Sequence, residues 1–478
     1  MSNLKEVQAR PSMDNNNTVL HITMLPWLAM GHLIPFLELS KCLALKGHRI
    51  TLISTPRNIK RLSNLSPNLS PLITLIELPL PHVHGLPENA ESSMDIHTNK
   101  SQHLKMAFDG LEAPIAAFLE RSTPDWIIYD YASHWLPTIA TRLGVPCAFF
   151  GLFTAAFLAF IGPPSVVLSN EATWSTAEDF TVAPSWVPFP SNIVFRLHEV
   201  KHALPENISG FSDSYRFGIA LRDCEIVLVR SRVEFEPEWF KLLTEFWQKP
   251  VIPVGFLPPS VEDGADEKDW AEVNAWLDKH RTKSVVYVAL GTEAKLSQDQ
   301  VNELALGLEL SGLPFFWVLR ELPGSTKDGN DMGMLPDGFE DRTRDRGLVF
   351  KGWAPQVRIL GHSAIGGILT HCGWNSVIEA LSLGRALILL PVMHDQGLNA
   401  RLLEEKKIGL EIPRDERDGS FTRDSVADTV RLVMVEKEGE PLRSKAKEAR
   451  VVLGNRDENE HCFDGFVRFL MEHKRQQG

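Results

Sequence analysis

The stretch from Trp353 to Gln396 constrains the fold of this chain more than any other part of it. The apolar run from Ile365 to Thr370 predicts a buried strand, and residues 377–383 have the 3.6-residue spacing of a helix. Between them lies the short polar turn His371-Cys-Gly-Trp-Asn-Ser376. A strand that leads through a tight turn into a helix predicts an α/β fold, with a candidate ligand site at the turn.

The start of that helix has the properties of an anion site. The first turn of a helix exposes unpaired N–H groups at the positive end of the helix dipole, and His371, Asn375 and Ser376 lie beside them. Such a turn binds phosphate. An ordinary strand-turn-helix unit with a chance polar turn is the alternative interpretation.

Side chains suited to the other parts of a nucleotide-sugar flank the turn. The ring of Trp353 and the amide of Gln356 suit a base, and the carboxylate of Glu379 suits ribose hydroxyls. A second predicted strand, Ala386 to Leu390, precedes Asp395 and Gln396, which suit vicinal sugar hydroxyls. The stretch therefore predicts a nucleotide-sugar site.

Length and composition limit the remaining possibilities. A chain of 478 residues is too long for one hydrophobic core, so we expect two large domains or more. A formal net charge of −12 and a pI near 5.8 argue against nucleic acid or an anionic membrane as the main partner. The five cysteines have no C-x-x-C pairing, which predicts neither a zinc site nor a disulfide framework.

The N-terminal residues and the most apolar run indicate a cytoplasmic protein without membrane insertion. Residues 1–18 are polar, lack an apolar signal segment and are expected to be disordered. The apolar run at 150–168 is interrupted by Pro163 and Pro164 before it reaches the ~20 residues that a membrane span needs.

The N-terminal half opens like a Rossmann fold. A strand from Val19 to Leu25, a loop, a helix from Phe36 to Lys46 and a strand from Arg49 to Ser54 follow in order. The Gly-x-Gly-x-x-Gly fingerprint is missing after the first strand, which disfavours an NAD-dependent enzyme. Residues 258–270 are acidic and begin with two prolines, and we interpret them as a linker. A second α/β series starts with the strand Ser284 to Leu290.

His32 is a candidate general base. It is predicted to lie in the loop after the first strand, at the carboxyl edge of a parallel sheet, where ligands bind in such folds. An imidazole with its ordinary pKa of ~6.5 is suited to accept a proton near neutral pH. Taken alone, a histidine in a loop is more often structural or solvated.

The stretch from Trp353 to Gln396 closely resembles the C-terminal signature box of plant UDP-sugar-dependent glycosyltransferases. The match includes the opening Trp-x-Pro-Gln, the His-Cys-Gly-Trp-Asn-Ser turn, the glutamate and the closing Asp-Gln. Gly31-His32-Leu-Ile-Pro35 is similar to that family's Gly-His-x-x-Pro. The resemblance covers the whole chain and implies the GT-B fold, two facing Rossmann-like domains. It assigns 19–257 to the acceptor domain, 271–455 to the UDP-sugar domain and 456–478 to a helix that crosses back to the acceptor domain.

The resemblance also implies roles for individual residues. His32 would deprotonate the acceptor hydroxyl, and Asp130, which follows the predicted strand Trp126 to Tyr129, would orient it. A helix N-cap is the alternative role for Asp130. The implied UDP-sugar ligands are Thr154, Thr292, Trp353, Ala354, Gln356, His371, Trp374, Asn375, Ser376, Glu379, Asp395 and Gln396. The implied acceptor contacts are Trp27, Met94, His97, Phe195, His198, Phe217 and Met393.

The implied reaction is direct displacement with inversion at the anomeric carbon. The box contains no Asp-x-Asp for a divalent ion, so we expect neither a metal nor another cofactor. The end of the box at Gln396 fits a hexose such as glucose, and UDP-rhamnose is the alternative donor. Segments such as 26–32, 54–58 and 395–401 resemble the subgroup that extends terpenoid and flavonoid glycosides, which indicates a sugar hydroxyl as acceptor. We expect a monomer.

Two other classes of function are less compatible with these residues. A non-catalytic nucleotide-sugar sensor would lack the base, whereas His32 and Asp130 are both present. A hydrolase or epimerase would need an acid and base pair of carboxylates around the sugar, and the stretch supplies only Glu379 and Asp395, to which we assign binding roles.

Overall fold

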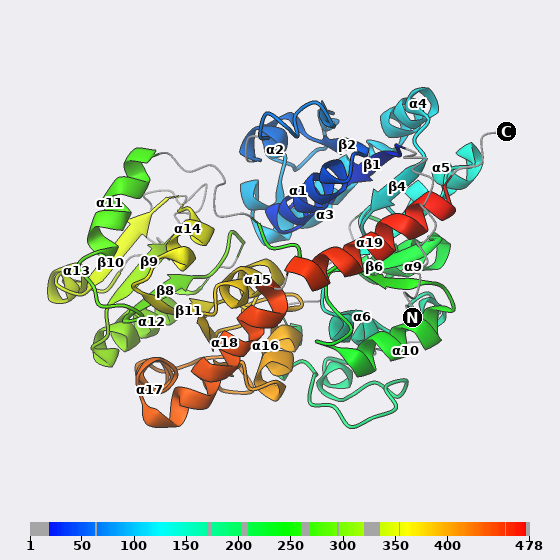
Figure 1. Cartoon of the computed structure of the whole chain (residues 1–478). Helices are drawn as coiled ribbons and strands as arrows, with labels where there is room; N and C mark the ends of the chain where they lie inside the picture. The colour runs from blue at the N-terminus through cyan, green and yellow to red at the C-terminus, as the bar shows by residue number, and fades with distance from the viewer. Residues whose placement is uncertain are drawn as a thin grey trace, which may run out of the picture.

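The structure, a computed structural model, describes residues 19–62, 65–169, 174, 176–201, 209–259, 267–293, 296–319, 335–352, 354–454 and 456–474. Within these residues the strands form two parallel sheets, each flanked by helices, in two lobes that face one another (Figure 1). This confirms the predicted α/β fold of the GT-B type. The expected disorder of residues 1–18 lies outside the described residues.

The N-terminal sheet has the strand order β3-β2-β1-β4-β5-β6-β7 in the described part of the chain. Its strands are short apolar runs such as Trp126-Ile-Ile-Tyr129, which is buried along its whole length, as expected for a parallel sheet covered on both faces. The strands are β1 (His21–Leu25), β2 (Arg49–Ser54), β3 (Ile73–Glu77), β4 (Trp126–Tyr129), β5 (Cys147–Gly151), β6 (Ile226–Val229) and β7 (Val251–Pro253).

The helices of this domain lie between these strands in sequence. They are α1 (Met30–Leu45), α2 (Pro56–Arg61), α3 (Ser101–Asp109), α4 (Glu112–Ser122), α5 (Leu136–Leu143), α6 (Ala155–Ile161), α7 (Pro164–Val167), α8 (Leu197–Lys201), α9 (Asp213–Asp223) and α10 (Pro237–Trp247).

The first helix corrects one sequence-based expectation. Helix α1 begins at Met30 rather than at Phe36, so His32 lies in the first turn of a helix and not in a loop. The helix contains Pro35, whose ring nitrogen has no N–H for the carbonyl of Gly31 four residues earlier. The helix tolerates this proline because that carbonyl accepts a hydrogen bond from the Asn375 side chain instead, at 3.0 Å.

The C-terminal sheet has the order β10-β9-β8-β11-β12-β13 among the described strands. The predicted strand Ile365 to Thr370 is β11, and the helix after it, α15, begins at Trp374, inside the polar turn. The strands are β8 (Val285–Ala289), β9 (Phe315–Leu319), β10 (Gly347–Lys351), β11 (Ile365–Thr370), β12 (Ala386–Leu389) and β13 (Gly409–Glu411). The helices are α11 (Glu267–Leu277), α12 (Gln298–Ser311), α13 (Phe339–Thr343), α14 (Gln356–Gly361), α15 (Trp374–Ser382), α16 (Gln396–Glu405), α17 (Arg423–Met434) and α18 (Glu440–Gly454).

The expected linker and the crossing helix join the two domains. Helix α11 already begins at Glu267, inside the expected linker 258–270. Helix α19 (Arg456–Glu472) follows α18 and lies along the N-terminal domain (Figure 1). Its residues Phe463, Phe466 and Leu470 belong to the core that β1 and α1 also form, and the indole N–H of Trp126 donates to the carbonyl of Leu470 at 2.9 Å. The chain therefore crosses back onto its first domain, as predicted.

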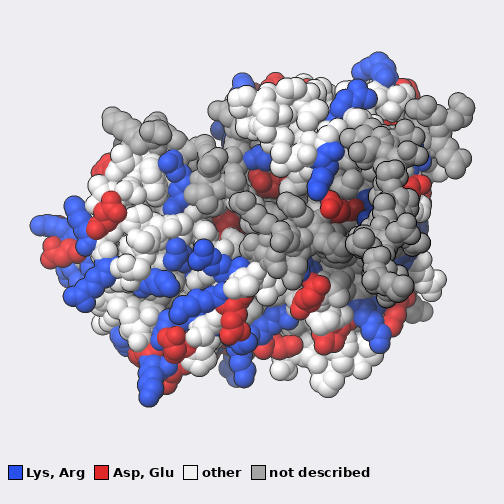
Figure 2. All heavy atoms as spheres, viewed as in Figure 1, with Lys and Arg blue, Asp and Glu red and all other residues white. Residues whose placement is uncertain are grey.

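The surface carries both signs of charge. On the face in Figure 2, acidic and basic side chains are interspersed over the C-terminal domain. Ion pairs such as Arg342 with Glu309, at 2.7 Å, join neighbouring elements there. None of the helices within the described ranges is both long and apolar enough to span a bilayer.

Candidate active site

His32 and Asp130 form a hydrogen-bonded pair at one edge of the N-terminal sheet. They follow β1 and β4, which are parallel neighbours, so their carboxyl ends lie together. Nδ1 of His32 is 2.7 Å from Oδ2 of Asp130, and the two side chains are 15% and 2% exposed. A proton on Nδ1 that is donated to Asp130 leaves Nε2 to accept another proton. The pair has the geometry of a base and its orienting carboxylate.

Backbone amides hold the Asp130 carboxylate in place. The N–H of Trp27 donates to Oδ2 at 2.7 Å, and the N–H of Ala132 donates to Oδ1 at 3.2 Å. Helix α5 begins at Leu136 with Trp135 as its N-cap, so the alternative role of Asp130 as a helix cap is wrong. The carboxylate instead joins the loops after β1 and β4.

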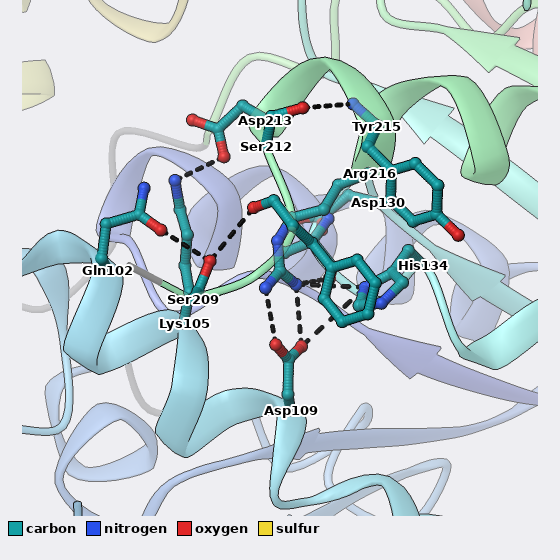
Figure 3. A network of polar contacts seen from close by, with 12 residues as sticks. Gln102, Lys105, Asp109, Asp130, His134, Ser209, Ser212, Asp213, Tyr215 and Arg216 are labelled. Carbon is teal, nitrogen blue, oxygen red and sulfur yellow. Dashed lines mark hydrogen bonds and ion pairs between the residues drawn. The ribbon is translucent and has the colours of Figure 1, made fainter. Parts of the chain in front are cut away.

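A buried arginine supports the loop that carries Asp130 (Figure 3). Arg216 of α9 is fully buried, and its Nη1 donates to the carbonyl of Ala132 at 2.9 Å and to Asp109 at 2.7 Å. Nη1 also lies 3.1 Å from Nδ1 of His134. Burial, with Arg216 nearby, lowers the pKa of His134. The guanidinium therefore links α3 and α9 to the loop that carries Asp130.

Aromatic rings line the pair on one side. The ring of His32 lies 5.8 Å from that of Tyr131 and 6.1 Å from that of Phe153, measured between centroids. Tyr131 stacks on Phe217 at 4.7 Å, and Phe153 stacks on Phe157 at 4.6 Å. Phe217 was a predicted acceptor contact. Tyr131, Phe153 and Phe157 were missed, although Tyr131 and Phe153 adjoin the predicted residues Asp130 and Thr154 in sequence.

Three of the other acceptor candidates lie on segments close to the loop after β1. Trp27 is buried and packs edge-on against Phe108, with the ring centroids 5.3 Å apart, so its ring is part of the core. Met94 is half-buried, in the turn whose residue Ser93 donates its N–H to the carbonyl of Leu28 at 2.9 Å. His97 follows that turn and is exposed.

The structure does not bring the predicted residues Phe195 and His198 to the His32 pair. The ring of Phe195 packs on Phe160, with the centroids 5.3 Å apart. His198 is buried between the domains, where a Cβ on Gly419 would lie 2.5 Å from the imidazole. Burial lowers the pKa of His198. The His198 contact depends on how the two domains meet, which the local sequence does not reveal.

The turn after β11 surrounds the ring of His371 closely. A Cβ on Gly291 or on Gly373 would lie 2.6 Å or 2.4 Å from Nε2 of His371. Burial lowers the pKa of His371 to about 4, so the ring is neutral at pH 7. Its Nδ1 is buried and has no hydrogen-bond partner among the described residues. The N-terminus of α15 adds the positive end of a helix dipole at this turn, as expected for an anion site. Thr292 is half-buried in the turn directly after Gly291.

Two predicted UDP-sugar ligands make contacts between the domains. The indole N–H of Trp374 donates to the carbonyl of Arg230 at 2.9 Å. The Asn375 amide donates to the carbonyl of Gly31 at 3.0 Å and accepts from the guanidinium of Arg230. Arg230 is fully buried, and burial lowers its pKa to about 10. The turn is thereby attached to the N-terminal domain, beside the helix that carries His32.

A polar network joins the predicted base and ribose ligands. The amide nitrogen of Gln356 lies 2.7 Å from Oε2 of Glu379 and 2.9 Å from the hydroxyl of Ser376. The hydroxyl of Tyr287, a residue that the sequence analysis did not select, donates to the Gln356 carbonyl oxygen at 3.3 Å. Burial raises the pKa of Glu379 to about 7. Trp353 lies outside the described residues, and Ala354 is half-buried just before α14.

The predicted sugar ligands lie at the start of α16. Asp395 is the N-cap residue of this helix, and burial raises its pKa. The carbonyl oxygen of the Gln396 side chain accepts from the backbone N–H groups of Val392 at 3.0 Å and Met393 at 2.9 Å, which leaves its NH₂ group for a ligand. Thr154 caps α6 and donates its hydroxyl hydrogen to Asn399 of α16 at 3.3 Å. The helix that carries the predicted sugar ligands thus meets the N-terminal domain through Asn399.

The described residues contain no group of three or more His, Cys, Asp or Glu side chains placed to hold a metal ion.

The chain is similar to known proteins over nearly its whole length. A family profile described as "UDP-glucoronosyl and UDP-glucosyl transferase" matches residues 248–438. UDP-glycosyltransferase 91C1 of Arabidopsis thaliana is 56% identical over 462 residues, which are 96% of this chain and 98% of that protein. Soyasaponin III rhamnosyltransferase of Glycine max is 41% identical over 96% of this chain and 97% of that protein.

A solved structure agrees in fold over nearly the whole chain. The complex of Phytolacca americana UGT2 with UDP-2fluoro-glucose and pterostilbene has a TM-score of 0.71 and 26% identity, and the match covers 95% of this chain and 100% of that one. The identity to the Arabidopsis and Glycine proteins, over 96% of this chain in each case, is high enough to show the family of the sequence. The chain belongs to the plant UDP-sugar-dependent glycosyltransferases of family 1.

Proposed function

We propose that this glycosyltransferase moves a hexose, with glucose as the favoured sugar, from UDP to a sugar hydroxyl of a plant glycoside. The observation that carries the proposal is the position of the His32 and Asp130 pair beside the donor turn, which Asn375 attaches to the helix of His32. A base beside the donor site can take the proton of an acceptor hydroxyl while that oxygen receives the sugar.

The proposed reaction is a single displacement with inversion. The acceptor oxygen attacks the anomeric carbon and loses its proton to Nε2 of His32, while the bond from that carbon to the β-phosphate oxygen breaks and UDP leaves. Asp130 stabilises the imidazolium that forms, because it is buried and held by two backbone amides. The positive end of α15 and the hydrogen bond from His371 stabilise the leaving diphosphate.

We propose that this reaction needs no divalent ion. A helix N-terminus and a neutral imidazole meet the diphosphate with N–H groups, and these already point at the place where charge develops. The protein is proposed to act as a cytoplasmic monomer.

The acceptor class is inferred from the wall beside His32. Stacked rings of Tyr131 and Phe217 suit the apolar body of a terpenoid or flavonoid. An aglycone hydroxyl and a sugar hydroxyl of a glycoside are the two possible nucleophiles, and we favour the sugar.

A UDP-rhamnose donor is the second candidate. The observation that favours it is the relative from Glycine max, which is named a rhamnosyltransferase.

The test is a transfer screen with purified protein in the presence of EDTA. UDP-glucose and UDP-rhamnose are each combined with plant glycosides and with the corresponding aglycones, and products are read by mass spectrometry. A gain of one hexose on a glycoside supports the proposal, and a gain of one deoxyhexose supports the second candidate. Transfer only to aglycones contradicts the acceptor class, and activity that requires an added divalent ion contradicts metal independence.

A further inference from the structure

Asn399 lies one helical turn after Asp395 on α16 and is fully buried. Its Nδ2 donates to Oδ2 of Asp395 at 2.7 Å and to the carbonyl of Cys372 at 3.1 Å. Its Oδ1 accepts the hydroxyl hydrogen of Thr154 at 3.3 Å. One amide thus joins the predicted sugar carboxylate, the diphosphate turn and the N-terminal domain.

The surroundings determine which way the amide points. A carboxylate and a carbonyl only accept hydrogen bonds, so the NH₂ group has to face Asp395 and Cys372. The hydroxyl of Thr154 already accepts from the N–H of Phe157 at 3.1 Å, and its own hydrogen is donated to Asn399. The rotated amide would place its oxygen against two acceptors. Asn399 is therefore held in one orientation with both ends of its amide bonded.

This orientation affects two parts of the donor site. Since Oδ2 of Asp395 accepts a hydrogen bond from Asn399, the plane of the carboxylate is fixed and its remaining lone pairs have set directions for a sugar hydroxyl. Cys372 has a φ of +68°, a left-handed conformation that is uncommon for a residue other than glycine. The bond from Asn399 to its carbonyl holds the chain in that conformation directly before α15.

We infer that Asn399 is a positioning residue that fixes the Asp395 carboxylate for the hydroxyls of the donor sugar. Through its hydrogen bond with Thr154, Asn399 also fixes the position of that carboxylate relative to the N-terminal domain. The inference rests on the proposed function, because it takes Asp395 as a ligand of the transferred sugar.

A double-mutant cycle tests the inference. The variants Asn399→Ala, Asp395→Ala and the double variant are compared by the ratio of KM for the UDP-sugar to the inhibition constant of UDP. That ratio isolates binding of the sugar from binding of the nucleotide. We expect Asn399→Ala to raise the ratio about tenfold in the wild-type background and less than about twofold in the Asp395→Ala background.

Two outcomes overturn the inference. The first is that Asn399→Ala leaves the ratio of KM to the inhibition constant unchanged. The second is that the change of this ratio in the double variant equals the product of the changes in the two single variants, because the two residues then act independently. If Asn399→Ala does not fold, Asn399→Asp takes its place in the cycle, because it keeps the shape of the side chain and removes the donor. A thermal shift on addition of UDP reports that each variant is folded.

A matched control is Asn302→Ala in the same domain. Asn302 lies on α12, where its side chain accepts from Gln298 at 2.9 Å, and we expect the ratio to stay at the wild-type value. A wild-type protein that transfers no sugar from either donor would contradict the proposed function. Wild-type transfer with additive effects in the cycle would contradict only the role of Asn399.

Discussion

The side-chain amide of Asn375 donates a hydrogen bond of 3.0 Å to the backbone carbonyl of Gly31. Gly31 lies in the first turn of the helix that carries His32, and Pro35 leaves its carbonyl without the usual partner within the helix. The contact therefore joins the donor turn of one domain to the base of the other. It also explains how α1 extends through a proline.

The first prediction concerns the base. We expect His32→Ala to lower the rate of transfer by about 10² to 10⁴, because no base remains to take the proton from the hydroxyl of the acceptor substrate. The dissociation constant for UDP is expected to stay within about threefold of wild type. Asp130→Asn is expected to lower the rate as well, because the amide no longer stabilises the imidazolium. Initial rates and calorimetric titration with UDP measure the two effects. Near-normal turnover by His32→Ala would refute the mechanism.

The second prediction concerns the contact of Asn375 with the buried Arg230. We expect Asn375→Ala to lower the free energy of unfolding by about 1 to 3 kcal/mol, since it leaves the fully buried Arg230 guanidinium with one hydrogen bond fewer. Urea unfolding followed by circular dichroism measures the loss. A variant as stable as wild type would show that the interdomain contact contributes little.

The third prediction concerns the space around His371. We expect Gly291→Ala to weaken UDP binding by about tenfold or more, because the new Cβ would lie 2.6 Å from the imidazole. Gly312→Ala is the matched control. Gly312 also has a positive φ, +70° against +79° for Gly291, but open space where the Cβ would lie. Both positions have a left-handed φ of similar size, so equal UDP affinities of the two variants would contradict the role of the His371 packing.

The fourth prediction concerns pH and Glu379. Burial raises the pKa of this carboxyl from its ordinary 4.5 to about 7, so the folded protein holds a proton that the unfolded chain releases. The Glu379 contribution to stability is therefore fully present below about pH 4.5, decreases as the pH rises to about 7 and stays low above that value.

We expect Glu379→Gln to remove this part of the pH dependence. The loss of stability between pH 5 and pH 8 in urea unfolding, without UDP, should be smaller by about 1 to 3 kcal/mol than in wild type. Glu303→Gln is the control, because Arg423 holds the pKa of Glu303 below its ordinary value and places its titration below this range. An unchanged difference for Glu379→Gln would contradict the raised pKa.

The local arrangement of the predicted donor residues could be anticipated because these residues are close together in sequence. The predicted strand is β11, the polar turn leads into α15, and Gln356, Ser376 and Glu379 form one network. The periods of a strand and a helix determine which side chains of a strand-turn-helix unit lie near each other in space. The local sequence pattern was therefore sufficient to predict this arrangement.

The acceptor side was predicted only in part. Asp130 was selected correctly as the residue beside His32, since both follow parallel strands. The rings of Tyr131, Phe153 and Phe157, which form a cluster beside His32, were not among the predicted residues, whereas Phe195 packs on Phe160 and His198 is buried against Gly419. Aromatic residues are spread through this half of the sequence, and nothing in their spacing distinguishes a pocket wall from a core.

The sequence by itself determined the family and the α/β fold, and it predicted the residues that are proposed to carry the chemistry. Only the tertiary structure decided that Asn375 supports the His32 helix, that His371 is neutral, and that Asn399 holds Asp395. The physical reason is that a hydrogen-bond partner and a pKa depend on which groups surround a side chain in space. Those groups come from both domains, and no local pattern brings them together.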